Sequence, residues 1–464
     1  MTQQAPWRTT AQELFVASLH APFGNLIARP WFDTVALRVV AHWFFPLSRL
    51  WASADAAHGS VERFFHEANI EPTPRLERRL QKRLERFEAV REDVLENERE
   101  WDAAFFGNAS ISPRTLDKIE FDRLSQRDLF NGLRGMFASL QLFDKIAPIR
   151  WQVPTPGEVE AVYGELVGDP ARAFAVPTEM PEVAVSRSVK HPHGHCNWLR
   201  FRSPSKRMND RVVARVYEPA GVSSPPTLIF GHGICVEFDH WRGLIDEVDA
   251  MVAAGIRVVR PEAPWHGRRL PRGRFGGEQF IATAPMGALD LFTSAVREWA
   301  VLIDWCRSSA KGPVDIGGSS LGAMTAQLVA DKSRDWPQRL RPDAMFLITH
   351  CGHIEDAVVH GSLAKVWRIA EATMAKGWTP EMMRKYMPLL DAQDRPVMPP
   401  ENIVTVLGDH DNVTPFANAE ALLDDWNIPA SNRFISRRGH FSVPIGMIRD
   451  HSSLERFRTV LANC

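Results

Sequence analysis

A serine flanked by glycines is the strongest chemical feature of this sequence. Gly318, Ser320 and Gly322 form a Gly-x-Ser-x-Gly run that directly follows a short apolar stretch, Val314 to Ile316, and opens a helix-like stretch, Leu321 to Asp331. At a tight strand-to-helix turn a serine hydroxyl is exposed, and its neighbours must be small because larger side chains would collide there. A tight turn without catalysis is the alternative interpretation. The flanking elements favour Ser320 as a nucleophile.

A base and an acid follow this serine in the chain. A serine hydroxyl is a weak nucleophile at neutral pH, so it needs a base within hydrogen-bonding distance and a third group that orients the base. Asp409 and Asp411 come directly after the apolar run Ile403 to Leu407. His440 lies further on, directly after a glycine, and is one of 16 histidines in the chain. The order serine, aspartate, histidine is the order found in hydrolases with this kind of serine turn.

The elements that must position these residues belong to an α/β sheet. From about residue 184 onward, short apolar runs rich in β-branched residues alternate with helix-length stretches, which predicts a mostly parallel sheet. The clearest helix covers Asp290 to Cys306. Ligands in such sheets bind beyond the carboxyl ends of the strands. The runs expected as strands are Val212 to Tyr217, Thr227 to Phe230, Ile256 to Val259, Val314 to Ile316, Met345 to Ile348 and Ile403 to Leu407.

Residues from about 184 to 464 resemble the α/β-hydrolase superfamily of serine hydrolases. In that family the acid loop commonly reads Gly-x-x-Asp-x-apolar-x-Pro. The resemblance therefore implies that Asp411 is the acid, and it leaves Asp356 as a rival, because some members place the acid after the preceding strand. It also implies that His440 is the base. The matching positions are Gly408, Asp411, Val413 and Pro415.

The same resemblance implies an oxyanion hole. The family uses the backbone N–H of the residue after the serine and a second N–H from the loop after the third strand. These positions correspond to Leu321 and Ile234. The segment Phe230 to Cys235 is similar to the family's His-Gly loop. Its histidine, His232, is expected at the substrate-binding edge, as a structural part of the loop rather than as a second base.

Arginines follow the next predicted strand. The segment Pro264 to Arg269 is similar to a loop that related hydrolases carry near the substrate. Arg268 and Arg269 are candidates for binding a carboxylate or phosphate of the substrate, because a guanidinium fork matches those anions. Salt bridges to Glu262 or Glu278 that fix the loop are the alternative.

A helical cap is expected at about residues 352–400, where the family inserts one. Helical stretches near Val366 to Lys376 and Pro380 to Leu390 carry tryptophans and methionines that would form an apolar roof for a long acyl chain. Packing of the same residues in the core is the alternative. The residues concerned are Val366, Trp367, Ile369, Met374, Trp378, Met382, Met383, Met387 and Leu389.

The N-terminal part, residues 1–150, is expected to be a helical domain, joined by a linker at 151–183, and the family resemblance does not cover it. Residues 75–101 form an amphipathic helix, with a solvated charged face or a contact between subunits. Residues 30–54 are mostly apolar, but Arg38, His42 and Arg49 interrupt them, so they are not expected to span a membrane. A helix packed on the core and a helix lying at a lipid interface are both consistent with this pattern.

Composition excludes several classes of function. The chain has 464 residues, 45% hydrophobic and 24% charged, with a net charge of −1, which indicates a folded protein with no overall attraction to nucleic acid. Five cysteines without a paired spacing and an N-terminus without signal-peptide character favour a cytoplasmic protein. The cluster His191, His193, His195 and Cys196 has no partner cluster, so no metal and no organic cofactor are expected.

Together these residues predict a serine esterase or lipase-like hydrolase. Ser320 would attack a small-molecule carboxylic ester or thioester, His440 would transfer the proton, and Asp411 would orient His440. The substrate could carry a long acyl chain or an anionic group. An acyltransferase or a carbon–carbon bond hydrolase would use the same three residues, and a non-catalytic interaction protein is a further alternative.

Overall fold

A mixed sheet forms the centre of the molecule. The computed structural model describes residues 29–143, 146–235 and 247–464. Within these residues the sheet has ten strands in the order β1-β3-β4-β6-β5-β7-β8-β9-β10, with β2 paired to β3. The strands are β1 Ala184–Val185, β2 Val189–His191, β3 Gly194–Arg202, β4 Arg211–Pro219, β5 Thr227–Gly231, β6 Arg257–Pro261, β7 Val314–Ser319, β8 Met345–Ile348, β9 Ile403–Gly408 and β10 Arg433–Ser436.

The strands from β6 to β10 run parallel, whereas β1, β3 and β4 pair antiparallel at one edge. The six predicted apolar runs are all strands, and they are buried because helices cover both faces of a parallel sheet. Strands β1 to β3 were not predicted. In β3 arginines and a histidine interrupt the apolar residues, so no continuous apolar run announces the strand.

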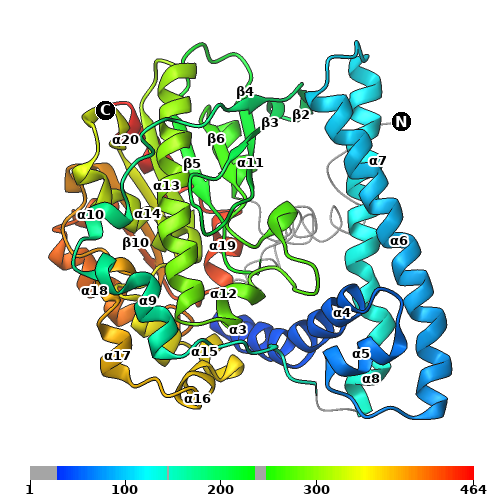
Figure 1. The fold of residues 1–464 in the computed structure, drawn as a ribbon. Helices are drawn as coiled ribbons and strands as arrows, with labels where there is room; N and C mark the ends of the chain where they lie inside the picture. Colours follow the sequence, from blue (N-terminus) through cyan, green and yellow to red (C-terminus); the bar gives the residue numbers. More distant parts are fainter. Residues whose placement is uncertain (1–28, 144–145, 236–246) are drawn as a thin grey trace.

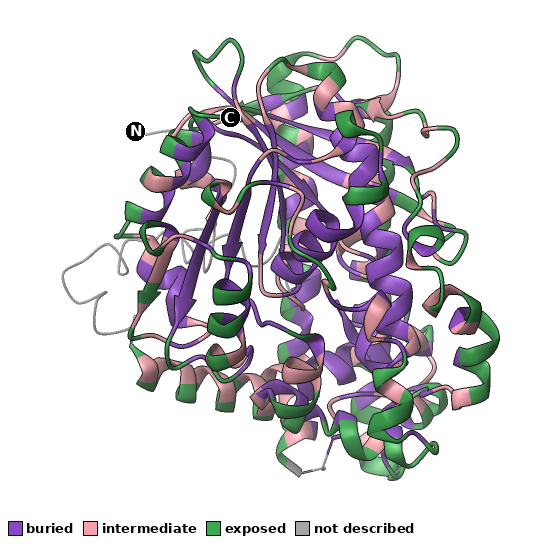
Figure 2. Cartoon of the chain, turned by 90° about the vertical axis from the view of Figure 1, so that its left-hand side faces the viewer, coloured by how far each residue is buried: buried purple, intermediate pink, exposed green. Residues whose placement is uncertain are grey.

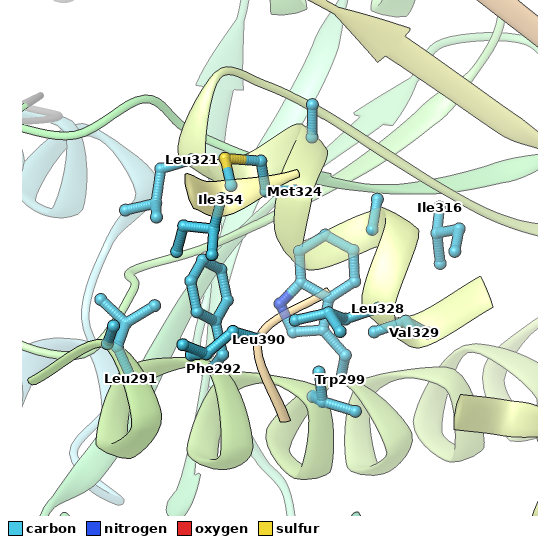
Figure 3. Close-up of a cluster of buried hydrophobic side chains, with 14 of the residues drawn as sticks. Leu291, Phe292, Trp299, Ile316, Leu321, Met324, Leu328, Val329, Ile354 and Leu390 are labelled. Atoms are coloured by element: carbon cyan, nitrogen blue, oxygen red, sulfur yellow. The ribbon is translucent and has the colours of Figure 1, made fainter. Parts of the chain in front are cut away.

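Helices α13 (Met286–Ser309) and α14 (Leu321–Lys332) cover one face of the sheet. Figure 3 shows Phe292 and Trp299 of α13 packed between these two helices, against Leu321 and Leu328 of α14. All four side chains are at most 6% exposed. Figure 2 shows the same contrast over the whole molecule, with buried strands inside and exposed residues on the outer helices. This packing fixes the position of the start of α14, where Ser320 lies.

The opposite face is covered by α11 (Val248–Ala253), α20 (Ser452–Leu461) and the end of α6 (Pro74–Phe106). Phe457 of α20 stacks on Phe346 of β8 with ring centroids 4.9 Å apart. Trp101 and Phe105 of α6 meet Trp198 of β3 edge-on, at centroid distances of 5.1 and 5.2 Å. The N-terminal helices therefore pack directly on the sheet.

The N-terminal helices also have a core of their own, in which Trp51, Phe87 and Phe130 pack together. Figure 1 shows α3 and α4 as one run that crosses from the sheet to the other N-terminal helices. The predicted helix at 75–101 is confirmed as part of α6. The remaining elements here are α3 Pro30–Val39, η1 Val40–Phe44, α4 Phe45–Ala57, α5 Val61–Ala68, α7 Pro113–Gly132, η2 Leu133–Phe137 and α8 Ala138–Phe143.

Residues 151–183, expected as a linker, instead contain two helices, α9 (Pro156–Val167) and α10 (Pro170–Ala173). Thr155 and Glu158 form a reciprocal capping box at the start of α9. Tyr163 is buried against α13, and its hydroxyl donates to Asp290 at 2.6 Å. Only Val159 and Tyr163 are buried in α9, so its apolar pattern is weak in the sequence.

The expected cap at 352–400 is a series of short helices. They are η6 Asp356–His360, α15 Ser362–Trp367, α16 Ile369–Met374, α17 Pro380–Arg384 and η7 Met387–Leu389. The predicted helix at 366–376 is interrupted at Arg368, whose φ of 63° ends α15. Two hydrogen bonds anchor the far part of the insertion: Trp378 Nε1 donates to the carbonyl of Pro154 (2.8 Å) and the Tyr386 hydroxyl to Glu160 (2.7 Å).

The structure confirms the predicted fold class: a mostly parallel α/β sheet between helices, with a helical insertion and a helical N-terminal region. Among the described residues, no helix has both the length and the apolar character needed to cross a membrane. The remaining elements are η3 Gly267–Arg269, α12 Glu278–Ala282, η4 Ser333–Asp335, η5 Gln338–Leu340, η8 Pro400–Asn402, α18 Phe416–Asp425, η9 Ala430–Asn432 and α19 Ser442–Met447.

Candidate active site

Ser320 lies on a strained turn between β7 and α14. Its φ of 54° and ψ of −116° are outside the regions that a serine ordinarily adopts. The turn persists because its backbone is held on both sides: Ser320 N donates to the carbonyl of Ile348 at 3.0 Å, and Ser320 O accepts from Met324 N at 3.1 Å. The hydroxyl is thereby presented at the carboxyl edge of the sheet, as the Gly-x-Ser-x-Gly run predicts.

The two glycines of this run are needed for close backbone contacts. A Cβ atom on Gly318 would lie 2.4 Å from the carbonyl carbon of Gly322. A Cβ atom on Gly322 would lie 2.1 Å from the carbonyl carbon of Gly231, at the end of β5. The start of α14 therefore touches the end of β5, which brings the loop that contains Ile234 next to Ser320.

His440 lies between Ser320 and Asp411. Its Nε2 is 3.1 Å from Ser320 Oγ, and its Nδ1 is 2.8 Å from Asp411 Oδ2. With Nδ1–H donating to the carboxylate, Nε2 is left to accept the serine proton. The structure thus brings together the three residues that the sequence selected as nucleophile, base and acid.

The carboxylate of Asp411 is held by its own loop. Oδ1 accepts hydrogen bonds from Val413 N and Thr414 N, both at 2.9 Å, and the side chain is 2% exposed. The two rivals lie elsewhere: Asp409 pairs with the exposed ring of His410, and Asp356 belongs to η6 of the insertion. Geometry favours Asp411 over both.

The hydroxyl of Thr414 was not singled out in the sequence. Its Oγ1 donates to Asp411 Oδ2 at 2.8 Å and lies 3.1 Å from His440 Nδ1. It therefore contacts both partners of the acid–base pair. A threonine three residues after the acid is a common loop residue, so no signal in the sequence marks it.

Asp33 of α3 was also missed. Its Oδ1 accepts hydrogen bonds from Phe441 N (2.6 Å) and Ser442 N (3.2 Å), directly after His440. A helix from the N-terminal region thus holds the loop that carries the base. The two segments are about 400 positions apart, and neither contains a motif that indicates the contact.

Ile234 and Leu321, expected from the sequence to form an oxyanion hole, both line a cavity that also contains Ser320. Leu321 is the first residue of α14, where backbone N–H groups have no intrahelical acceptor and the helix dipole favours negative charge. Ile234 lines both cavities that meet at Ser320. The loop of Ile234 is fixed by His266, whose Nε2 accepts a hydrogen bond from Cys235 N at 3.2 Å.

His232 lines a cavity at Ser320, but both of its ring nitrogens are used by the backbone. Nδ1 donates to the carbonyl of Gly233 (2.7 Å), and Nε2 accepts from Ala263 N (3.1 Å). Burial, together with the neighbouring ring of His266, holds the pKa of His232 well below its ordinary value. A neutral imidazole that ties two loops together is a structural element, not a ligand for an anion.

Arg269, proposed above as a substrate-binding residue, lies in a buried ion pair instead. Its guanidinium donates to Asp210 at 2.8 and 3.0 Å and to Glu298 at 2.7 and 2.8 Å. The side chain is only 1% exposed. A buried guanidinium is costly without a carboxylate partner, and Arg269 has two. Its donors are then used within the protein.

Arg268 also differs from the expectation of a substrate ligand. It pairs with Glu98 of α6 (3.2 Å) and with Glu262 (3.6 Å), and it stacks over the ring of Trp101. As far as the described residues define the cavities at Ser320, neither Arg268 nor its neighbour lines them. The alternative of a loop-fixing salt bridge to Glu262 is what the structure contains.

Two cavities meet at Ser320. A cavity of about 710 Å³ lies on one side, and its walls include His232, Arg260, Thr349, His440 and Phe441. It is called the polar cavity below because of the polar side chains in its wall, although most of its lining surface is apolar. An apolar cavity of about 540 Å³ lies on the other side, beneath the insertion, and its walls include Phe280, Phe292, Met324, Ile354, Leu363 and Trp367. A bond placed at Ser320 Oγ would therefore have one substituent in each cavity.

The roof residues of the insertion divide between the cavity and other places. Trp367 and Ile369 line the apolar cavity, as the cap prediction requires. Met374 and Met382 are 63% and 43% exposed, so they face solvent. Among the described residues, no group of three or more histidine, cysteine or carboxylate side chains has the arrangement of a metal site, and His191 pairs with Asp249 at 3.2 Å.

Comparisons with known proteins add a description of the fold. No protein-family model matches the chain, and a comparison with curated protein sequences finds no match. Solved structures with a similar chain trace include a cold-adapted esterase from an Arctic intertidal metagenomic library, at 14% identity over 60% of this chain and 95% of that one, with a TM-score of 0.37.

Two further structures give similar values. Acetyl xylan esterase 1 from a Thermoanaerobacterium species is 16% identical over 65% of this chain and 96% of that one, with a TM-score of 0.38. An acylaminoacyl peptidase from Pyrococcus horikoshii is 13% identical over 61% of this chain and 48% of that one, with a TM-score of 0.39.

Proposed function

We propose that the protein is a serine hydrolase that cleaves a carboxylic ester or thioester with an apolar acyl group. The observation that carries this proposal is the chain of contacts from Ser320 Oγ to His440 (3.1 Å) and from His440 to Asp411 (2.8 Å), on a turn whose backbone is strained at the serine. An activated serine needs a base that accepts its proton and an acid that orients the base, and the strained turn exposes its hydroxyl.

The reaction follows from these contacts. Ser320 Oγ attacks the carbonyl carbon of the substrate while His440 Nε2 accepts the serine proton, and Asp411 stabilises the resulting imidazolium. The N–H groups of Leu321 and Ile234 would stabilise the oxyanion. His440 then donates its proton to the leaving alkoxide or thiolate, which departs and leaves the acyl group on Ser320. Water, activated by His440, releases the acid and restores the serine.

The two cavities divide the substrate between them. The apolar cavity suits an acyl chain, because burial of its methylene groups against Phe292, Met324 and Trp367 is favourable at about 0.8 kcal/mol for each CH₂. The polar cavity, with Arg260 and Thr349 in its wall, suits the leaving group. This arrangement supports an ester with an apolar acid part and a polar alcohol or thiol part.

Labelling with a fluorophosphonate probe tests the assignment of the nucleophile. The wild-type protein should form a covalent adduct, and Ser320→Ala should form none. Ser319→Ala is the matched control, because Ser319 is adjacent to the turn and its hydroxyl also lies at the polar cavity. Labelling that persists in Ser320→Ala, or disappears only in Ser319→Ala, would contradict the proposal.

A series of p-nitrophenyl esters of graded chain length tests the assignment of the apolar cavity. Ala357 lies in its wall, on η6, so Ala357→Phe should fill part of the cavity and shift the preferred chain to a shorter one. Met382→Phe, at an exposed position of the insertion, should leave the preference unchanged. An identical chain-length profile in all three proteins would exclude this cavity as the acyl site.

A further inference from the structure

Helix α3 and turn η1 expose an apolar face. Trp31, Val35, Val39 and Trp43 recur every four residues along this run and are 54%, 47%, 50% and 43% exposed. The opposite side of the same run packs against the core through Leu37, Val40 and Phe44. The four exposed residues are called the outer face below. Contiguous exposed apolar side chains usually mark an interaction site.

The charges on and beside the outer face are basic. Arg38 and His42 lie between its apolar residues and are exposed, and Arg29 is exposed just before the helix begins. Asp33 is the single carboxylate in the sequence of α3 and η1, and it points inward to accept hydrogen bonds from Phe441 and Ser442. An apolar face with basic flanks and tryptophans at both ends is the pattern of a helix that lies in a membrane interface.

The same run reaches both cavities of the site. Near its start, Asp33 binds the backbone of Phe441, which lines the polar cavity. Directly after its end, the ring of Phe45, the first residue of α4, meets Trp367, which lines the apolar cavity, with centroids 5.1 Å apart. The outer face is therefore carried by an element whose inner side supports the walls of both cavities.

We propose that the outer face of α3 and η1 docks on a lipid surface that carries anionic headgroups. Its two half-exposed tryptophans offer on the order of 200–250 Å² of contact area, and the two valines add less. A stable contact between two copies of a protein needs about 800 Å² from each. A single narrow helix face falls short of that area, whereas an interfacial helix needs only a shallow apolar stripe and basic flanks.

Vesicle flotation measures lipid binding and does not depend on hydrolysis. A failure of this proposal can therefore be distinguished from a failure of the proposed function. Wild-type protein is mixed with vesicles of phosphatidylcholine and phosphatidylglycerol in a 7:3 ratio, or of phosphatidylcholine alone. We expect the full-length protein to float with the anionic vesicles. A variant with Trp31→Ser, Val35→Ser, Val39→Ser and Trp43→Ser should float at least tenfold less.

A matched control carries Phe121→Ser and Leu129→Ser, which remove two apolar side chains of similar exposure (48% and 45%) from α7. It should float like the wild type. All of these proteins should unfold at the melting temperature of the wild type, which shows that they are folded. A second variant, Arg29→Glu with Arg38→Glu, should lose the preference for anionic vesicles.

Three results would overturn the proposal. The first is a wild-type protein that does not float, or an outer-face variant that floats equally well. The second is a change in the oligomeric mass of the outer-face variant by light scattering, which would assign the face to a second copy of the chain. The third is vesicle binding that arises only after deletion of residues 1–28, which would assign the face to that segment.

Discussion

Two groups of polar side chains follow the strands of the sheet, and the molecule uses them differently. After β7, β9 and β10, the side chains of Ser320, Asp411 and His440 contact one another, and Ser320 and His440 line a cavity. After β6, Arg268 and Arg269 form ion pairs with carboxylates of the protein itself. Both groups lie at the carboxyl edge of the parallel sheet. A residue at this edge therefore does not necessarily bind substrate.

The difference lies in what the side chains face. Ser320, His440 and Asp411 form one chain of contacts, each on a loop directly after a strand, and two of them line a cavity. Arg268 pairs with Glu98 of the N-terminal helix α6, and Arg269 pairs with Asp210 and Glu298 of the α/β part. The two arginines therefore stabilise the fold, whereas Ser320 and His440 are open to a substrate.

The largest effect is expected from a change at Asp411, which contacts His440. Asp411→Asn should leave the fold intact but remove the charge that orients His440, so kcat should fall by roughly 10⁴-fold. The measurement is hydrolysis of an activated ester, with the melting temperature as the check on folding. Asp409→Asn changes an exposed carboxylate two positions away and should have little effect. Equal losses in the two variants would show that the loop, not the acid, matters.

The next largest effect is expected from a change at Arg269, one of the two arginines that pair with carboxylates of the protein. Arg269→Met leaves Glu298 and Asp210 without their partner, and loss of one side of a buried ion pair costs about 3–5 kcal/mol. Urea unfolding measures this cost, while fluorophosphonate labelling of the folded protein should keep its rate. Arg339→Met, which removes the exposed pair with Asp304, should cost less than about 1 kcal/mol. Slower labelling with unchanged stability would instead make Arg269 a substrate ligand.

The third change is at His266, which belongs neither to the group of Ser320, Asp411 and His440 nor to the two arginines. His266→Phe removes the acceptor for Cys235 N and so loosens the loop of Ile234. Loss of one oxyanion donor costs about 10²–10³-fold in kcat, so a loosened donor should cost about 10–100-fold. KM should change little, because the loop acts on the transition state. His193→Phe, at an exposed histidine, is the control; a rise in KM alone would assign His266 to substrate binding.

The smallest effect concerns pH. Burial lowers the pKa of His350 to about 4, and its ring is held neutral between Gln327 and Thr405. The unfolded chain binds the proton at its ordinary pKa of about 6.5, so stability is lost as the pH falls through 6.5 toward 4. Between pH 7 and pH 5 this histidine should account for about 2 kcal/mol.

Urea unfolding of His350→Gln at both pH values measures that contribution. The glutamine cannot take up a proton, so the difference between pH 7 and pH 5 should shrink by this amount relative to the wild type. A glutamine at the exposed His58 should leave the difference unchanged. If His350→Gln showed the same acid sensitivity as the wild type, the loss would have to come from other groups.

The contacts among Ser320, His440 and Asp411 were predictable because their signals are local. Gly318, Ser320 and Gly322 lie within five residues, and close backbone contact dictates their size. The central strands were predictable as continuous apolar runs, and β3 was not, because arginines and a histidine interrupt its apolar residues. The acid needed the loop pattern around Asp411 as well, since Asp409 follows the same strand.

The remaining parts depend on contacts between distant segments. Asp33 holds the loop of His440 from about 400 positions away, and Glu98 neutralises Arg268 from 170 positions away. A single sequence contains no signal for such pairs. Thr414 and His266 act through hydrogen bonds to residues of the site, and their residue types are common in loops. The folded chain was needed to find all four.

The anchored end of the insertion has a kinetic consequence. Trp378 and Tyr386 are tied to Pro154 and to Glu160 of α9, and α9 is fixed to α13 by Tyr163. The insertion cannot swing open as one lid without breaking these bonds. Motion that admits a substrate is then confined to η6, α15 and α16, whose side chains also line the apolar cavity. The residues that set the longest acyl chain would thus also set the rates of its entry and release.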